Sequence, residues 1–211
     1  MPAGLLETLT VALAAYLLGS ISFAVLVSRV MGLPDPRGYG SKNPGATNVL
    51  RSGSKLAAIF TLVGDAGKGA LAVGLAVLYT GESPVTGMHP PIAGAMAFLG
   101  HLYPVFLNFK GGKGVATAAG TLLAFNGWLG LGALATFGIL LAFFRMVSLA
   151  SLVASVFAVF WAWFLFGLVP LVPAVGAMAL MIIWRHRENI GRILAGRESR
   201  LGQKKAEAKT T

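Results

Sequence analysis

The sequence of 211 residues contains no cysteine, and only 11% of its residues are charged. Without cysteine the chain cannot form disulfides, thiolate nucleophiles or cysteine-ligated metal sites. A soluble domain carries about 25% charged residues, so this chain has too little polar surface to cover a water-soluble fold. Lipid is therefore expected as its outer solvent, in agreement with a mean hydropathy of +0.76.

Acidic residues are also scarce, because 7 Asp and Glu stand against 17 Lys and Arg and give a formal net charge of +10. In a soluble protein this excess would suggest nucleic acid. Here the basic residues interrupt apolar spans and do not form a stripe with aromatic residues, so nucleic acid is not an expected partner. An anionic lipid or an anionic substrate suits the charge better.

Long apolar segments, separated by polar or Gly/Pro-rich breaks, occupy most of the chain. They are interpreted as helices, because a closed barrel would need alternating strands. The segments cover residues 5–30, 56–79, 91–107, 115–125, 128–144, 149–166 and 168–184. The predicted fold is an all-α polytopic transmembrane bundle that forms one domain over residues 1–199. Residues 200–211 are expected to be a disordered cytoplasmic tail.

The number of spans depends on residues 115–125, which as a helix would reach only about 17 Å across an apolar core of about 30 Å. With seven spans and the N-terminus outside, every loop that carries Lys or Arg falls on the inner side. Merging residues 115–144 into one span would place Lys113 and Arg145 on opposite faces. Seven spans with a bend at Asn126 are therefore predicted, and five spans with re-entrant short segments are the alternative.

The first polar loop, residues 38–51, is rich in small residues, Asn and Pro, which disfavour a helix before about residue 46. Ser41, Thr47 and Asn48 can donate hydrogen bonds to phosphate oxygens. The planar guanidinium of Arg51 fits a phosphate in a bidentate manner. The alternative is a tight turn whose arginine extends to anionic headgroups.

The second loop, residues 108–117, has glycines at 111, 112 and 114. Such a run lets successive N–H groups point into one concavity that suits an anion, and the following helix start adds partial positive charge. Lys113 supplies a full charge. The loop is not a Walker A motif, because Gly114 stands where Ser or Thr is required and Leu107 where the first Gly is required. Phosphate binding without a nucleotide is predicted; a plain helix-start turn is the alternative.

The third polar segment follows the last span and contains His186 and Asn189, which would share a helix face. Its basic residues equally satisfy the positive-inside rule, so this segment alone decides nothing.

Several polar residues lie within or beside the spans. Asp65 and Lys68 lie at i, i+3 inside the second span, where charges either pair or line a polar cavity. A structural ion pair and a wall of the site both stay open. Ser148 and Ser151 could reach the same cavity, although serines in such helices usually bond their own backbone. His101 is expected to bridge two helices.

Together these motifs resemble one family, the bacterial acyl-phosphate-dependent glycerol-3-phosphate acyltransferases known as PlsY. The matching residues are Gly40, Ser41, Asn43, Gly45, Asn48, Arg51, Asp65, Lys68, Gly69, the run 109–117, Arg145, Ser148, Ser151, His186 and Asn189. Any one motif is weak, but the set is specific. Its order and spacing over residues 40–189 suit a full-length match.

The resemblance implies transfer of a fatty acyl group from acyl phosphate to the 1-hydroxyl of glycerol 3-phosphate, giving lysophosphatidic acid and phosphate. It implies a multi-pass protein of the bacterial inner membrane, with its site toward the cytoplasm and with the soluble enzyme that makes acyl phosphate as a possible partner. No metal or cofactor is expected. The residues that it assigns to the substrates are Ser41, Arg51, Lys113, His186 and Asn189, with Gly111, Gly112 and Gly114 as the phosphate loop and Asn43, Gly45, Thr47, Asn48, Asp65, Lys68, Ser148 and Ser151 as further binding residues.

No residue is evident as a nucleophile, since cysteine is absent and Ser41 has no histidine near it in the sequence. Direct attack of the glycerol hydroxyl on the acyl carbon is therefore predicted. The base is either His186 or an oxygen of the donor phosphate. The rival function is a transporter or flippase for a phosphorylated metabolite or lipid, because charged residues and glycine breaks in spans are also transporter features.

Overall fold

The computed structural model describes residues 3–203 and is built from helices and loops over that range. The helices are α1 (Ala3–Gly19), α2 (Phe23–Val30), α3 (Ala46–Val49), α4 (Lys55–Thr80), α5 (His89–Leu102), α6 (Val115–Phe125), α7 (Gly127–Phe144), α8 (Val147–Phe166), α9 (Leu171–Arg185) and α10 (Arg187–Leu194), with 3₁₀ turns η1 (Leu50–Ser52) and η2 (Val105–Leu107). The predicted all-α fold is confirmed.

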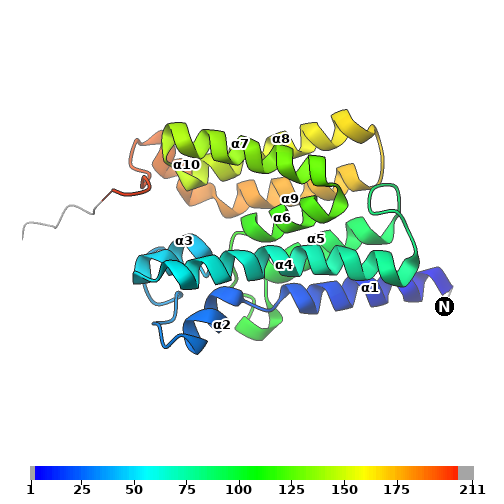
Figure 1. Cartoon of the computed structure of the whole chain (residues 1–211), viewed down its shortest axis with the longest axis horizontal. Coiled ribbons are helices and arrows are strands. Elements are labelled where there is room, and N and C mark those ends of the chain that lie inside the picture. The colour runs from blue at the N-terminus through cyan, green and yellow to red at the C-terminus, as the bar shows by residue number, and fades with distance from the viewer. Residues whose placement is uncertain (1–2, 204–211) are drawn as a thin grey trace, which may run out of the picture.

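The helices form two groups that lie on either side of α6 (Figure 1). In one group α1 packs on α5 and α5 on α4; in the other α7 packs on α8 and α8 on α9, while α6 contacts both α4 and α7. The outward faces carry large apolar side chains, such as Leu78 at 83% exposure and Phe143 at 81%. Such surfaces suit contact with lipid.

Within residues 3–203, five helical stretches are long and apolar enough to cross a membrane. They are Gly4–Val30, Lys55–Thr80, His89–Leu107, Gly127–Phe144 and Val147–Phe166. Two further apolar helices, α6 with 11 residues and α9 with 15, are shorter. The five long stretches coincide with five of the seven predicted segments, and the two short ones with the other two.

The first apolar segment, predicted as one helix over 5–30, is broken after Gly19 and resumes at Phe23. A Cβ on Gly19 would collide with the backbone of Ala97 in α5, so the two helices cross in close contact here. The break frees the carbonyl of Ile21, which accepts a hydrogen bond from Lys68 Nζ at 2.7 Å. A backbone group freed inside a membrane must find such a partner.

The bend predicted at Asn126 is confirmed. Its side-chain oxygen accepts hydrogen bonds from the backbone N–H groups of Trp128 at 2.9 Å and Leu129 at 3.3 Å, which caps α7. Because Asn126 itself is extended (φ −161°, ψ 133°), α7 runs back alongside α6. The chain therefore makes a short hairpin here and not one long helix.

The polar connections gather at one end of the bundle (Figure 1). The α2–α4 connection, the α7–α8 turn and α10 lie there, whereas the N-terminus and the α4–α5 and α8–α9 connections lie toward the other end. Leu201 bonds Arg145 through its backbone, with its N–H 2.7 Å from the Arg145 carbonyl oxygen. The first residues of the predicted tail are thus attached to the α7–α8 turn; residues 204–211 lie outside the described range.

Candidate phosphate-binding site

The glycine-rich loop, residues 108–114, lies between the end of α5 and the start of α6. The N–H of Gly111 donates to the Leu102 carbonyl at 3.2 Å, and the N–H of Gly112 donates to the His101 carbonyl at 3.1 Å. These two amides therefore hold the loop to α5. This differs from the expectation that the glycine amides together form an anion-binding concavity, since two of them already have protein acceptors.

Glycine is required in this loop because the backbone passes so close to α5. A Cβ on Gly111 would collide with the His101 carbonyl oxygen, and one on Gly112 with the His101 ring. Gly114 has φ +80°, a conformation that L residues rarely adopt, and a Cβ there would meet the ring of Phe98. The sequence pattern of three glycines is thus explained by packing as well as by any ligand.

Arg185, at the end of α9, holds the loop from the opposite side. Its Nε donates to the Gly112 carbonyl at 3.1 Å and its Nη2 to the Gly111 carbonyl at 2.9 Å. Its guanidinium also lies 5.7 Å from the centre of the Tyr103 ring. Because Arg185 is next to His186 in the chain, this contact fixes the third polar segment against the second.

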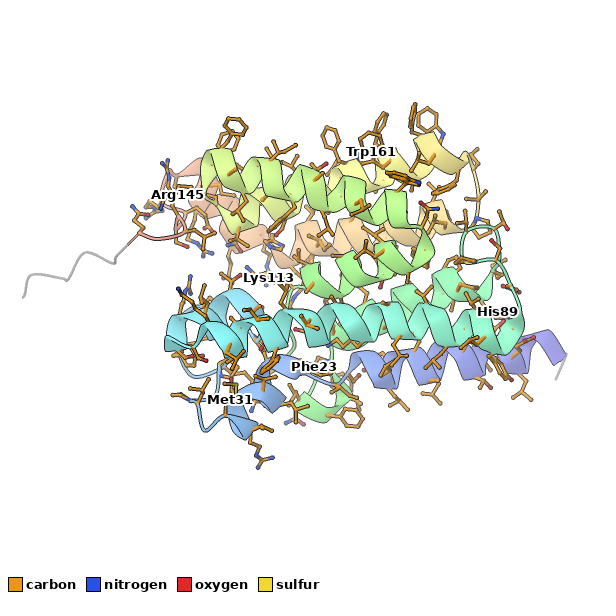
Figure 2. All side chains as sticks on the ribbon, in the orientation of Figure 1. Phe23, Met31, His89, Lys113, Arg145 and Trp161 are labelled. Carbon is orange, nitrogen blue, oxygen red and sulfur yellow. The ribbon has the colours of Figure 1, made fainter. Side chains whose placement is uncertain are left out.

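Lys113 lies between the two helix groups, set inward from the end that carries α10 (Figure 2). Its ammonium donates a hydrogen bond to the side-chain oxygen of Asn189 in α10. The start of α6 follows at once, and its first N–H groups add partial positive charge. Burial, reinforced by the positive charge of Arg192, lowers the pKa of Lys113 to about 8.

Glu198 organises the groups around Asn189. Its Oε1 accepts from Asn189 Nδ2 at 2.6 Å and from Ser148 Oγ at 2.8 Å, and its Oε2 accepts from Arg192 Nε at 2.7 Å. Since a carboxylate only accepts, the amide of Asn189 must turn its nitrogen to Glu198 and its oxygen to Lys113. Burial raises the pKa of Glu198, but the hydrogen bonds from Asn189, Ser148 and Arg192 outweigh burial and leave that pKa lowered.

His186 stands at the junction of α9 and α10 and is only 3% exposed. Its Nδ1 lies 2.8 Å from the carbonyl oxygen of Ile182. A carbonyl only accepts, so Nδ1 carries the proton and Nε2 of the neutral ring is left as an acceptor. Burial, together with the nearby charge of Lys113, lowers the pKa of His186 to about 4.

The first loop folds around Asn48, which is buried. Its Nδ2 donates to the carbonyls of Pro36 at 2.7 Å and Tyr39 at 3.2 Å, and its Oδ1 accepts from the Ser41 N–H at 3.0 Å and from Arg51 Nη1 at 3.4 Å. The amide is thus used inside the loop, and the expected role of Asn48 as a phosphate donor becomes one of shaping the loop. Ser41 and Arg51 are exposed.

The first and second loops adjoin. A Cβ on Gly112 would lie 3.1 Å from the Pro44 carbonyl oxygen, so the loop around Pro44 is in contact with the glycine-rich loop. Gly45, next to it, is the N-cap residue of α3, Asn43 is half-buried and Thr47 is exposed. The structure therefore brings together the second loop with the first at Pro44 and with the third at Arg185 and Asn189.

Three of the predicted site residues use their polar side-chain groups in contacts within the helices, so these groups are not available to a ligand at this site. Asp65 and Lys68 are 2% and 3% exposed and form an ion pair with each other at 2.8 Å, which corresponds to the first of the two alternatives that the sequence left open. Ser151 Oγ donates to the Val147 carbonyl one turn earlier at 2.8 Å, as serines in such helices often do. Ser148, by contrast, points to Glu198.

Sequence reasoning missed Arg185 and Glu198. Arg185 belongs to the basic segment beside His186, where the positive-inside rule already accounts for its charge. Glu198 stands nine positions after Asn189 and contacts Ser148 fifty positions away, so no helical period links them. The only signal was an acidic residue in a strongly basic segment.

Comparisons with known proteins agree over nearly the whole chain. A family model described as Glycerol-3-phosphate acyltransferase matches residues 9–196. A glycerol-3-phosphate acyltransferase of Ralstonia nicotianae is 60% identical over 198 residues, covering 94% of this chain and 96% of the relative. One of Paraburkholderia phymatum is 57% identical over 204 residues, covering 96% and 97%.

Solved structures are similar as well. The crystal structure of PlsY (YgiH), an integral membrane glycerol 3-phosphate acyltransferase, in its glycerol 3-phosphate form, matches with a TM-score of 0.86 at 37% identity and covers 92% of this chain and 96% of that one. Its lysophosphatidic acid form matches with a TM-score of 0.83 at 38% identity, covering 92% and 95%.

Proposed function

The chain belongs to the glycerol-3-phosphate acyltransferase family, and from this membership we propose that it transfers a fatty acyl group from acyl phosphate to the 1-hydroxyl of glycerol 3-phosphate. It is a multi-pass membrane acyltransferase that uses glycerol 3-phosphate. The acyl phosphate donor and the direct mechanism are the parts that we add. The products are lysophosphatidic acid and inorganic phosphate.

The observation that carries the proposal is the position of Lys113. A cationic side chain, partly buried between two helix groups, stands beside Asn189 and at the start of α6. Phosphate groups are bound by this combination of charge, amide and helix start. Both proposed substrates carry a phosphate, and one of them carries an acyl chain, which explains why the site is built into a membrane bundle.

Direct transfer is favoured because no serine hydroxyl within residues 3–203 is bonded to a histidine. Ser148 bonds Glu198 and Ser151 bonds its own helix. Thr8 does lie 3.0 Å from His89 at the other end of the bundle, but its hydroxyl donates to the Gly4 carbonyl and is not activated. The acyl phosphate already contains a good leaving group, so the enzyme mainly aligns the substrates and stabilises charge.

In the proposed step the glycerol 1-hydroxyl oxygen forms a bond to the acyl carbon, and the bond from that carbon to the phosphate oxygen breaks. His186 Nε2, neutral and unprotonated, accepts the hydrogen bond of the attacking hydroxyl and orients it. With a pKa of about 4, His186 is a weak base, so the proton ends on the departing phosphate, which is more basic. This combines the two bases that the sequence left open.

We further propose seven crossings, with the end that carries α10 toward the cytoplasm of a bacterial inner membrane. The contact of Arg145 with Leu201 supports seven, because five crossings with re-entrant α6 and α9 would put Arg145 and the C-terminal segment on opposite faces. The cytoplasm is the side on which Lys and Arg accumulate. From that side the site can receive acyl phosphate from the soluble enzyme that makes it.

The rival function, transport of a phosphorylated metabolite or lipid, makes a different prediction for the purified protein. We expect that palmitoyl phosphate and glycerol 3-phosphate, added to the protein in detergent, give phosphate release that depends on glycerol 3-phosphate. Absence of such release, together with uptake of glycerol 3-phosphate into liposomes, would support transport. A labelled acyl-protein formed from palmitoyl phosphate alone would overturn direct transfer.

The two cationic residues can be tested with controls from their own loops. Arg51→Ala and Lys113→Ala should each lower kcat/KM for glycerol 3-phosphate by at least about tenfold, because each removes a charge-assisted hydrogen bond. Lys42→Ala and Lys110→Ala remove exposed cations from the same two loops and should change kcat/KM little. Unimpaired kinetics in Arg51→Ala or Lys113→Ala would remove that residue from the site.

A further inference from the structure

A buried polar cluster adjoins the glycine-rich loop and has no part in the reaction described above. It consists of Asp65 and Lys68 in α4 and His101 in α5, which are 2%, 3% and 7% exposed. His101 Nδ1 lies 3.4 Å from Asp65 Oδ1, which is also 2.8 Å from Lys68 Nζ. Charges this deep in a membrane bundle are costly unless they are paired.

Charge pairing alone does not explain the histidine. Asp65 already has Lys68 as its counter-ion, and Lys68 also donates to the Ile21 carbonyl at 2.7 Å. The contact between Asp65 and Lys68 does not itself involve residue 101. We therefore expect the imidazole to have a second structural role, one that involves its other nitrogen, Nε2.

The other edge of the His101 ring meets the glycine-rich loop. The atoms nearest to a Cβ built on Gly112 are His101 Nε2 and Cε1, the latter at 3.0 Å. The backbone of His101 contacts the same residue, because its carbonyl accepts the Gly112 N–H at 3.1 Å. One residue thus bonds the loop through its backbone and supports it through its ring, while Asp65 holds the ring from behind.

Arg185 holds the opposite side of the loop through the carbonyls of Gly111 and Gly112. The loop is therefore enclosed between His101 and Arg185, and the next residue along the chain is Lys113. A displacement of about 1 Å at a substrate-positioning group can cost about a hundredfold in rate. The position of Lys113 thus depends on what supports Gly112.

We propose that His101 is a positioning residue for the glycine-rich loop: the Asp65–Lys68 pair fixes one edge of its ring, and the other edge sets the position of Gly112 and hence of Lys113. The expected effect of His101 on catalysis rests on the proposed function, in which Lys113 binds phosphate. Its expected effect on the position of the loop is independent of that function, so the two effects can be tested separately.

The first test measures the loop without substrate. Hydrogen–deuterium exchange of the peptide that contains residues 108–114 should be about tenfold faster in His101→Asn than in the wild type, because the loop loses the ring that packs against Gly112 even though the backbone acceptor at position 101 remains. Asn places an amide near the former Nδ1, so it keeps a partner for Asp65 and protects the fold.

His89→Asn is the matched control: His89 is also buried and pairs with a carboxylate, Glu82, at 2.8 Å, but at the other end of the bundle. It should leave exchange of the loop unchanged.

The second test uses kinetics. Gly112→Ala should lower kcat/KM by about tenfold or more, because its Cβ meets the His101 ring. Adding His101→Ala removes that ring, so the double variant should be more active than the two separate losses predict, by about fivefold or more. Additive losses, or loop exchange that stays at the wild-type rate in a folded His101→Asn protein, would overturn the proposal. A wild type without acyltransferase activity would refute the proposed function but leave the exchange test valid.

Discussion

Lys113 is the residue whose chemistry depends most on its surroundings. Burial and the nearby Arg192 disfavour its charged form, while Glu198 and Glu188 favour it, and the balance lowers its pKa to about 8. A lysine with an ordinary pKa would stay charged over the whole physiological range. Here the charge that would bind phosphate is retained at neutral pH and is lost in mildly alkaline solution.

The first prediction follows from this pKa. Below about pH 8 Lys113 is protonated and holds phosphate; as the pH rises through that value the proton is lost, and kcat/KM for glycerol 3-phosphate should fall, approaching about tenfold per pH unit. Lys113→Arg keeps its charge and should retain activity to higher pH, even if its maximum is lower. Lys110→Arg, in the exposed part of the same loop, is the control and should keep the wild-type profile. An unchanged alkaline limb in Lys113→Arg would contradict the assignment.

The second prediction concerns Glu198, which sequence reasoning did not select. In Glu198→Gln an amide replaces the carboxylate, so one of its two ends can no longer accept from Asn189, Ser148 or Arg192. Asn189 then loses its fixed orientation toward Lys113, and kcat/KM should fall by about tenfold. Glu7→Gln, in α1 at the other end of the bundle, should have little effect. Equal activity of the two variants in steady-state assays would show that Glu198 does not orient Asn189.

At the scale of elements, the short helix α6 and the bend that follows it give the site its position. Two polar breaks make this possible: the glycine-rich loop before Val115 and Asn126 after Phe125. Close packing helps, since Gly120 lies against the backbone of Ala66 in α4 and Gly69 against that of Thr117. Small residues allow such approach where there is little hydrophobic force between helices.

The third prediction tests the bend. Asn126→Ala removes the side-chain cap of α7 and should lower the free energy of unfolding by about 1 kcal/mol. Chemical denaturation in detergent micelles measures this change. Asn126→Asp keeps the acceptor for the N–H groups of Trp128 and Leu129 and should restore most of the stability. If Asp were as destabilising as Ala, the cap would not be what holds the bend.

At the scale of the whole molecule, the bundle has one polar end and one with few charges. The first loop, Arg145 and α10 share the polar end, and the Glu82–His89 pair lies at the other (Figures 1 and 2). The N–H of His89 donates to one oxygen of the Glu82 carboxylate and its ring contacts the other, and these bonds outweigh burial and lower the pKa of Glu82. Such an asymmetry orients the protein in a membrane.

The fourth prediction tests this orientation and the number of crossings. Because the chain has no cysteine, single cysteines can be introduced at three exposed positions: Thr86→Cys, Leu168→Cys and Gln203→Cys. With seven crossings, a membrane-impermeant maleimide should label the first two in intact spheroplasts and the third only after permeabilisation. Five crossings with re-entrant α6 and α9 would instead protect Leu168→Cys. Labelling of Gln203→Cys in intact spheroplasts would reverse the proposed orientation.

Much of this architecture was predictable from the sequence. Hydropathy alone located the apolar segments, because a membrane-spanning helix must be apolar along its length. The bend at Asn126 followed from the distribution of charge, and the family followed from short motifs in a fixed order. The α1–α2 break was not predicted; it lies where Gly19 closely approaches Ala97, a contact between residues far apart in the chain.

The sequence by itself determined the membrane environment and the helical class and selected the candidate phosphate-binding residues, since these depend on composition and local spacing. Only the tertiary structure decided which groups remain available to a ligand. It directed the amides of Gly111 and Gly112 and the side chains of Asn48, Asp65 and Lys68 to protein partners. It also brought Arg185 and Glu198 to the site. The physical reason is that a hydrogen-bonding group has few positions for partners, and which partners fill them depends on residues that only folding brings together.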